Sequence, residues 1–188
     1  MVDIPREVIE LAKAGDLEAF EKIYKAASGF VYNVALRIMN NRQEAEEVTQ
    51  DVFLKVYRNL RDFEFRSSLK TWMYRITANT ALNAYKRISK VRNRTQGLES
   101  VENTAVFSDQ ADKDIIKHDE QKTNEEALTL LLGRLNADQR ACIVLREIEG
   151  LRYEEIARAL KININTVRSR LKRAREAMAA FSQGGLEK

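Results

Sequence analysis

Two apolar stripes near the C-terminus restrict the possible folds more than any other feature of this sequence. The first, over residues 156–160, has the spacing of one face of a short helix. The second repeats at i, i+4, i+7 and i+11 and consists of Val167, Leu171, Ala174 and Met178. Asn163 and Asn165 lie between the stripes and can form a turn or cap the second helix. A short helix, a tight turn and a longer helix in this order predict a helix-turn-helix.

Composition extends the helical prediction to the whole chain. The 188 residues include only seven glycines and one proline, too few for the many tight turns of an all-β protein. Hydrophobic residues make up 44% and charged residues 32%, which favours a folded chain over a disordered one. Apolar residues recur at helical spacing from Arg6 to about Arg94, and again from about Glu125. We therefore predict an all-α fold with two small helical domains.

The segment between the two helical blocks lacks a clear periodicity. Residues 99–126 contain nine acidic residues and three lysines, a local net charge of −6. Such a composition is typical of a flexible linker that is partly helical at most. The predicted organisation is a first domain over residues 1–94, an acidic linker over residues 95–123 and a second domain over residues 124–188.

Charge and side-chain chemistry narrow the class of protein. The formal net charge is +4, which is compatible with a nucleic-acid partner. His118 and Cys142 are the only residues of their types, so neither an internal disulfide nor a Cys/His zinc set is expected. We interpret His118 as a solvated side chain and Cys142 as a core residue. No apolar run is long enough to span a bilayer, and the N-terminus is unlike a signal peptide, so we predict a cytoplasmic protein without membrane insertion.

The helix that follows the turn carries a continuous basic surface. Residues 161–175 hold six Lys or Arg residues and no acid. Because the apolar stripe must face inward, the outward side chains that can reach base edges are Thr166, Arg168, Ser169, Lys172 and Arg173. Arg170 and Arg175 lie more to the flanks and suit phosphate contacts. DNA binding is favoured over a solvated basic helix, RNA binding and a membrane-surface helix, since a membrane helix would need the apolar face that the fold requires.

The first block combines aromatic, amide and basic side chains. On a helix that begins near Ser68, the predicted inner stripe is Leu69, Trp72 and Ile76. The opposite polar stripe consists of Arg75, Asn79, Asn83, Lys86 or Arg87, and Lys90. Phe63 and Phe65 precede this helix in a predicted loop. Amides for base edges, cations for phosphates and aromatic rings for stacking are the components of single-strand binding, although the aromatic side chains, Trp72 above all, also suit a core.

An amphipathic helix precedes this loop, and its predicted outer face is acidic. Its inner stripe is expected to contain Val48, Val52, Phe53, Val56 and Tyr57. Glu47 and Asp51 lie one turn apart on the outer face, a spacing that a divalent cation could use. No histidine or further acid converges on them, so we favour a solvated or protein-binding surface and predict no metal site.

Three motifs in this order resemble bacterial RNA polymerase sigma factors of the extracytoplasmic-function (ECF) group, in the sigma-70 family. They are AEEVTQDVFLKVYRNL, FRSSLKTWMYRITANTALN and LREIEGLRYEEIARALKININTVRSRLKRARE. The resemblance covers nearly the whole chain. It implies that residues to about Arg94 form sigma region 2 and that residues from about Asn124 form sigma region 4. The chain departs from the family in the turn, where many members carry Pro and Gly and this chain has Asn163 and Asn165.

The resemblance also implies roles for the surface residues of region 2. The helix over residues 44–60 is expected to bind the clamp coiled coil of the polymerase β′ subunit. Its candidate contacts are Glu47, Gln50, Asp51 and Leu54. The 61–68 loop and the following helix are expected to recognise the −10 element, flip a base and melt the duplex. The candidate −10 residues are Phe63, Phe65, Arg75, Asn79, Asn83, Lys86 and Arg87.

Region 4 is expected, by the same resemblance, to read the −35 element and to contact the β-flap of the polymerase. An anti-sigma factor is expected to hold the protein inactive, and no cofactor is expected. A dimeric DNA-binding regulator and a metal-dependent nuclease are alternatives that fit parts of the sequence. The sequence favours a promoter-specificity subunit that has no catalytic activity and is monomeric when free.

Overall fold

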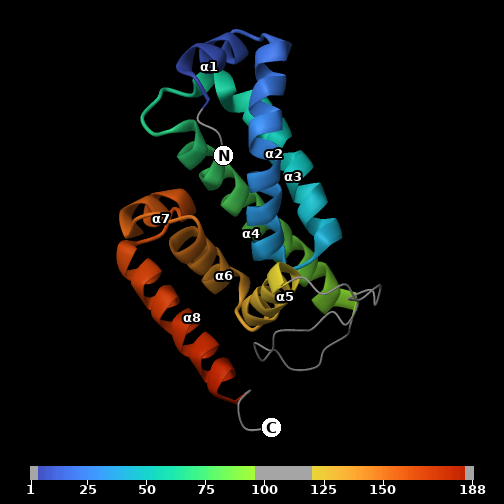
Figure 1. Cartoon of the computed structure of the whole chain (residues 1–188), viewed down its shortest axis with the longest axis vertical. Helices are drawn as coiled ribbons and strands as arrows, with labels where there is room; N and C mark the ends of the chain where they lie inside the picture. The colour runs from blue at the N-terminus through green and yellow to red at the C-terminus, as the bar shows by residue number, and fades with distance from the viewer. Residues whose placement is uncertain (1–3, 96–119, 185–188) are drawn as a thin grey trace.

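The structure, a computed structural model, describes residues 4–95 and 120–184, and these residues form helices and short connections without strands (Figure 1). The helices of the first region are α1 (Arg6–Lys13), α2 (Leu17–Met39), α3 (Arg42–Asn59), the 3-10 helix η1 (Leu60–Asp62) and α4 (Leu69–Thr95). Those of the second region are α5 (Glu120–Gly133), α6 (Ala137–Ile143), the π-helix η2 (Val144–Ile148), α7 (Tyr153–Leu160) and α8 (Ile164–Gly184). The all-α prediction is confirmed.

The first region is a bundle in which the long helix α2 packs against α1, α3 and α4 (Figure 1). Polar side chains set the starts of its helices. Asp16 accepts a hydrogen bond from the Ala19 amide at 2.8 Å and caps α2, and Asn41 accepts one from the Glu44 amide at 3.0 Å and caps α3. Asn40, with a left-handed φ of 56°, ends α2. The break at residues 40–41 therefore follows from local chemistry.

Helix α4 buries more of its surface than the sequence predicted. Leu69 is buried as expected, but Trp72 and Ile76 are only half-buried, whereas Met73 and Tyr74 are almost completely buried. The reason is that α4 packs against α2 and α3 of its own region and also against α6 and α7 of the second region. The predicted inner stripe was therefore incomplete, because it assumed one packing surface where the helix has two.

The core of the second region lies among α6, α7 and α8. The predicted stripe of α8 is confirmed, since Val167, Leu171 and Ala174 are fully buried and Met178 is half-buried. Asn136 begins α6 with a capping box, in which its side chain and that of Gln139 each accept a hydrogen bond from the other residue's amide. Helix α8 packs against α7 through its buried stripe, and the two helices form the predicted helix-turn-helix.

The turn between α7 and α8 uses other residues than expected. Lys161, rather than an asparagine, takes the left-handed conformation at φ 53° and ends α7. Asn163 accepts a hydrogen bond from the Asn165 amide at 2.8 Å, and its carbonyl accepts from the amides of Thr166 and Val167. Asn163 thus serves the capping role that the sequence allowed, and α8 begins at residue 164, slightly earlier than expected.

The two regions pack against each other through α2 and α4 on one side and α6 and α7 on the other (Figure 1). The Tyr74 hydroxyl donates a hydrogen bond to the Glu149 carboxylate, and Arg37 lies 3.6 Å from that carboxylate. Burial and then Glu149 raise the pKa of Tyr74, so its hydroxyl stays protonated as a donor. Arg140 of α6 is also buried at this contact, 5.3 Å from the centroid of the Tyr85 ring.

The predicted acidic linker lies mostly outside the described residues, as does His118. Helix α4 extends to Thr95 and α5 begins at Glu120, so helices occupy both ends of the predicted 95–123 segment. None of the helices described is long and apolar enough to cross a membrane.

Candidate nucleic-acid and polymerase interfaces

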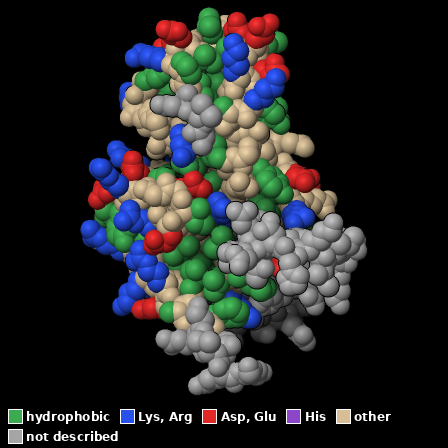
Figure 2. Space-filling model, in the orientation of Figure 1, with side chains coloured by type: hydrophobic (Ala, Val, Ile, Leu, Met, Phe, Trp, Pro, Cys, Tyr) green, Lys and Arg blue, Asp and Glu red, His purple; other side chains and the backbone are tan. Residues whose placement is uncertain are grey.

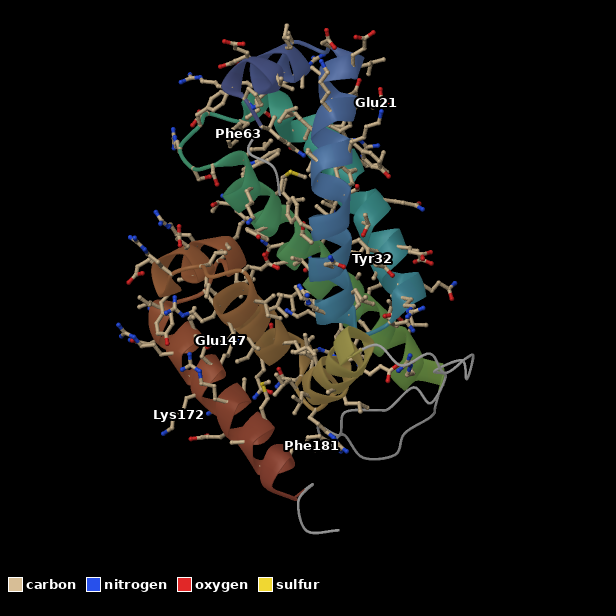
Figure 3. The ribbon with its side chains drawn as sticks, in the orientation of Figure 1. Glu21, Tyr32, Phe63, Glu147, Lys172 and Phe181 are labelled. Atoms are coloured by element: carbon tan, nitrogen blue, oxygen red, sulfur yellow. The ribbon has the colours of Figure 1, made fainter. Side chains whose placement is uncertain are left out.

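Helix α8 presents its basic side chains on the side away from the core. Arg168, Ser169, Lys172 and Arg173 are exposed, and Thr166 is half-buried near the start of the helix. Figure 2 shows Lys and Arg side chains gathered over α7 and α8, and Figure 3 shows Lys172 pointing outward from α8. The burial of the opposite stripe forces this orientation, as the sequence indicated.

Asn165 orients Arg168 at the start of α8. The Arg168 Nη1 atom donates to Asn165 Oδ1 at 2.9 Å, and the backbone of Asn165 is itself fixed by Asn163. The guanidinium keeps further donors free for a base edge, because it carries five N–H groups in a planar fork. Sequence reasoning treated Asn165 only as a turn or cap residue and missed this positioning contact.

The flanking arginines of α8 are paired with acids of their own region. Arg170 lies 3.3 Å from Asp138 of α6, and Arg175 donates to Glu147 of η2 at 2.6 Å. The bond to Glu147 raises the pKa of Arg175. Both residues therefore help to fix α8 on the second region, and their predicted phosphate contacts stay predictions.

The polar stripe of α4 is exposed except at its centre. Arg75, Asn83, Lys86 and Arg87 are exposed, whereas Asn79 is half-buried against α7. The Asn79 side-chain amide donates to the carbonyl of Arg75 at 2.6 Å and to the carbonyl of Ala159 at 2.7 Å. Since a side-chain amide has two N–H groups, both donors of Asn79 are occupied in this arrangement.

The two phenylalanines before α4 lie in different environments. Phe63 is 3% exposed, and its ring centroid is 5.2 Å from that of Trp72 and 4.8 Å from that of Phe65 (Phe63 is labelled in Figure 3). Phe65 is half-buried and has a left-handed φ of 58°, which is rare for an aromatic residue. The structure thus places Phe63 in the core and leaves Phe65 as the more accessible ring.

The four candidate polymerase contacts share one exposed face of α3. Glu47, Gln50, Asp51 and Leu54 are all exposed and lie at i, i+3, i+4 and i+7. Leu54 is 54% exposed and places an apolar side chain among the three polar ones. The helix therefore brings these four side chains together as predicted.

Exposed tyrosines extend this face and were missed by sequence reasoning. Tyr57 was expected on the buried stripe of α3 but is 48% exposed, with its ring packed edge-on against Phe20. Tyr24 of α2 is 46% exposed and packs against Phe53. Because aromatic side chains beside polar ones are typical of protein interfaces, the α2–α3 surface has the character of a protein-binding site. An exposed tyrosine and a buried one look alike in sequence.

The described residues contain no group of three or more His, Cys, Asp or Glu side chains that could hold a metal ion. Cys142 is buried, as predicted, and burial raises the pKa of its thiol to about 11.

The fold and its basic helix-turn-helix define an all-helical, two-region DNA-binding protein. A family profile described as sigma-70 region 2 matches residues 23–91, and one described as sigma-70, region 4 matches residues 125–178. The RNA polymerase sigma-H factor of Pseudomonas aeruginosa is 33% identical over 177 residues, which cover 92% of this chain and 91% of that protein. The ECF RNA polymerase sigma-E factor of Escherichia coli K12 is 33% identical over 174 residues, 91% of this chain and 90% of that protein. The chain belongs to the sigma-70 family of RNA polymerase sigma factors, in the ECF group.

Two solved structures share the fold. One is CnrH in complex with the cytosolic domain of CnrY, with a TM-score of 0.66 and 20% identity over 97% of this chain and 99% of that chain. The other is the sigma factor RpoE in complex with the anti-sigma factor NepR from Bartonella quintana, with a TM-score of 0.63 and 24% identity over 87% of this chain and 96% of that chain. These likenesses support the two-region helical architecture.

Proposed function

We propose that this chain binds core RNA polymerase in the cytoplasm and directs it to specific promoters, without catalytic activity of its own. The observation that carries the proposal is the presence of both sigma regions, each with its expected surface exposed. Region 4 offers the basic outer side of α8, and region 2 offers the polar stripe of α4 and the α2–α3 surface. The domain boundaries proposed from the sequence, 1–94 and 124–188, enclose these surfaces.

Helix α8 is the proposed reader of the −35 element. Arg168 stands at its exposed N-terminal end, where a recognition helix meets base edges, and Asn165 holds its guanidinium in place. Thr166, Ser169, Lys172 and Arg173 complete the proposed duplex contacts. Arg170 and Arg175 would meet phosphates with whichever N–H groups Asp138 and Glu147 leave free.

The stripe of α4 and the loop before it are the proposed −10 site. Phe65 supplies an aromatic face for a flipped base. The exposed basic and amide side chains of α4 follow one side of the helix. Asn79 can donate to a base only after it gives up its bond to the Arg75 carbonyl or its bond to the Ala159 carbonyl, and the second of these bonds ties α4 to α7. Phe63, by contrast, supports the loop from inside the core.

The α2–α3 surface is the proposed site for the β′ clamp coiled coil, with Glu47, Gln50, Asp51 and Leu54 at its centre and Tyr24 and Tyr57 beside them. Region 4 is proposed to contact the β-flap. An anti-sigma factor is proposed as the regulator, because one of the solved structures of like fold is a complex with a protein described as such. The free chain is proposed to be a monomer.

Reconstitution with core RNA polymerase tests the proposal directly. The purified chain should co-elute with core enzyme, and the holoenzyme should select promoters from random DNA and protect two separated elements. Protection of a palindrome by the chain alone, together with a dimer in light scattering, would establish a conventional regulator instead. Mg²⁺-dependent cleavage of DNA by the chain would establish a nuclease.

A substitution at Arg168 tests which residue reads the −35 element. Arg168→Ala should weaken binding to the selected promoter by about 1–3 kcal/mol and relax the preference at one base pair. Arg158→Ala, which removes the same charge from the exposed side of α7, is the matched control and should leave the base preference unchanged. An equal loss on every sequence would reassign Arg168 to a phosphate contact.

A further inference from the structure

Helix α1 precedes both segments that match the sigma families, yet it closes over the loop before α4. Lys13, its last residue, donates from Nζ to the Phe63 carbonyl at 2.7 Å, fifty residues along the chain. The Lys13 side chain is only 20% exposed, and Glu10 lies 3.7 Å from its ammonium. A hydrogen bond from an ammonium that is largely shielded from water is stronger than the same bond on an open surface.

The same ammonium also contacts the ring of Phe65. Lys13 Nζ lies 4.9 Å from the ring centroid, and the guanidinium carbon of Arg6 lies 4.4 Å from it. Both cations come from α1, two turns apart, and attract the electron-rich face of the ring. Helix α1 therefore holds the Phe65 side chain as well as the backbone two residues before it.

The backbone of Phe65 explains why such a restraint is needed. Its φ of 58° is unfavourable for a residue with a bulky side chain. A conformation of this kind persists only where surrounding contacts enforce it, and it is concentrated at functional sites. The Phe63 ring packs against Trp72 and the Phe63 carbonyl accepts the bond from Lys13. The backbone two residues before Phe65 is therefore held in place.

We propose that Lys13 is a positioning residue for promoter opening: it holds the 61–68 loop in the strained form that presents the Phe65 ring to a flipped base. This inference rests on the proposed function, because it requires the loop to act at the −10 element. Lys13 itself need not touch the DNA. Its effect passes through the Phe63 carbonyl and the Phe65 ring.

The test uses the holoenzyme and a promoter fragment selected by the wild-type holoenzyme, with 2-aminopurine in the −10 element to report melting. Lys13→Met keeps the length of the side chain and removes the ammonium. We expect unchanged affinity for core polymerase and unchanged retention of closed promoter complexes. The equilibrium constant between open and closed complexes should fall about tenfold or more, which is the usual effect of losing a hydrogen bond to a charged group. Lys13→Arg should restore most of the opening, because a guanidinium can donate to the same carbonyl.

A double-mutant cycle separates positioning from mere stabilisation. In a Phe65→Leu background, Lys13→Met should lower opening little further, because the two residues act through one contact. Lys22→Met, on an exposed part of α2, is the matched control and should leave opening unchanged. Urea unfolding of each variant shows whether it is folded at the temperature of the assay.

Three results would overturn the inference. If Lys13→Met matches the wild type in opening, the ammonium has no role. If core binding and opening fall together in step with stability, Lys13 is a structural residue only. Additive effects of Lys13→Met and Phe65→Leu would show that the two act separately. Failure of the wild-type holoenzyme to open any promoter would refute the proposed function itself, a result that the variants cannot mimic.

Discussion

At the scale of single residues, Phe63 is a core residue, whereas the ring of Phe65 is partly accessible to solvent. Phe63→Ala should lower the free energy of unfolding by about 3–5 kcal/mol. The Phe63 ring is almost completely buried beside Trp72, and its removal leaves a cavity there. Phe65→Ala should cost much less, since its ring is only half-buried and its backbone is strained. Urea unfolding followed by circular dichroism measures both. Equal losses would show that Phe65 belongs to the core as well.

Cys142 offers a residue-level probe of the second region. The thiol is fully buried, and its pKa of about 11 makes the thiolate at pH 8 about a hundredfold scarcer than in an exposed cysteine. Iodoacetamide should therefore label the native chain very slowly, and labelling should accelerate as urea unfolds region 4 or as the pH rises towards 11. Mass spectrometry gives the rate, and Cys142→Ala is the blank. Rapid labelling at pH 8 without urea would contradict this burial.

Residue-level features were predictable from the sequence where a local rule decides them. Asp16 and Asn136 are caps because an oxygen three residues before an amide satisfies the first turn of a helix. The separation of Phe63 from Phe65 was not predictable, because no helical period applies in a loop. The pairing of Arg168 with Asn165 depends on the backbone of the turn, which the sequence leaves open.

At the scale of elements, the turn between α7 and α8 carries strain at Lys161. Lys161→Gly should raise the free energy of unfolding by about 1 kcal/mol, because a φ of 53° costs lysine more than it costs glycine. Lys161→Asn should give part of this gain, since asparagine tolerates the left-handed conformation better than lysine. Urea unfolding measures both, and a loss of stability in the glycine variant would mean that the side chain of Lys161 contributes more than its backbone costs.

The boundaries of the elements were largely predictable, whereas the buried side of α4 was not. Periodicity and caps located the helices because both are properties of one segment. The burial of Met73 and Tyr74 depends on which helices pack against α4. Two of these helices, α6 and α7, belong to the second region, which is distant in the sequence. Contacts between the two regions produce no periodic pattern of apolar residues in the sequence of either region. The hydrogen bond between Tyr74 and Glu149 was therefore not predictable from the sequence.

At the scale of the whole molecule, Glu149 links the two regions. Its carboxylate accepts the Tyr74 hydroxyl and pairs with Arg37, both from region 2. Glu149→Ala should therefore weaken the contact by about 1–3 kcal/mol and shift the chain towards more extended forms. Small-angle X-ray scattering should show a larger radius of gyration than for the wild type.

Glu147→Ala is the control for this prediction. Glu147 lies two residues away in η2 but pairs with Arg175 inside region 4, so its loss should loosen α8 without separating the regions. An unchanged radius of gyration in Glu149→Ala, or the same increase in both variants, would show that Glu149 does not hold the regions together.

Arg140 packs on the Tyr85 ring but also brings one unfavourable atom to the contact between the regions. The side chain is 4% exposed, burial lowers its pKa, and within the described part of the chain its Nε has no hydrogen-bond partner. An unpaired buried donor costs about 1–3 kcal/mol, and water would remove that cost as soon as the regions part. Because this cost falls on the closed arrangement alone, it lowers the free energy that is needed to part the two regions.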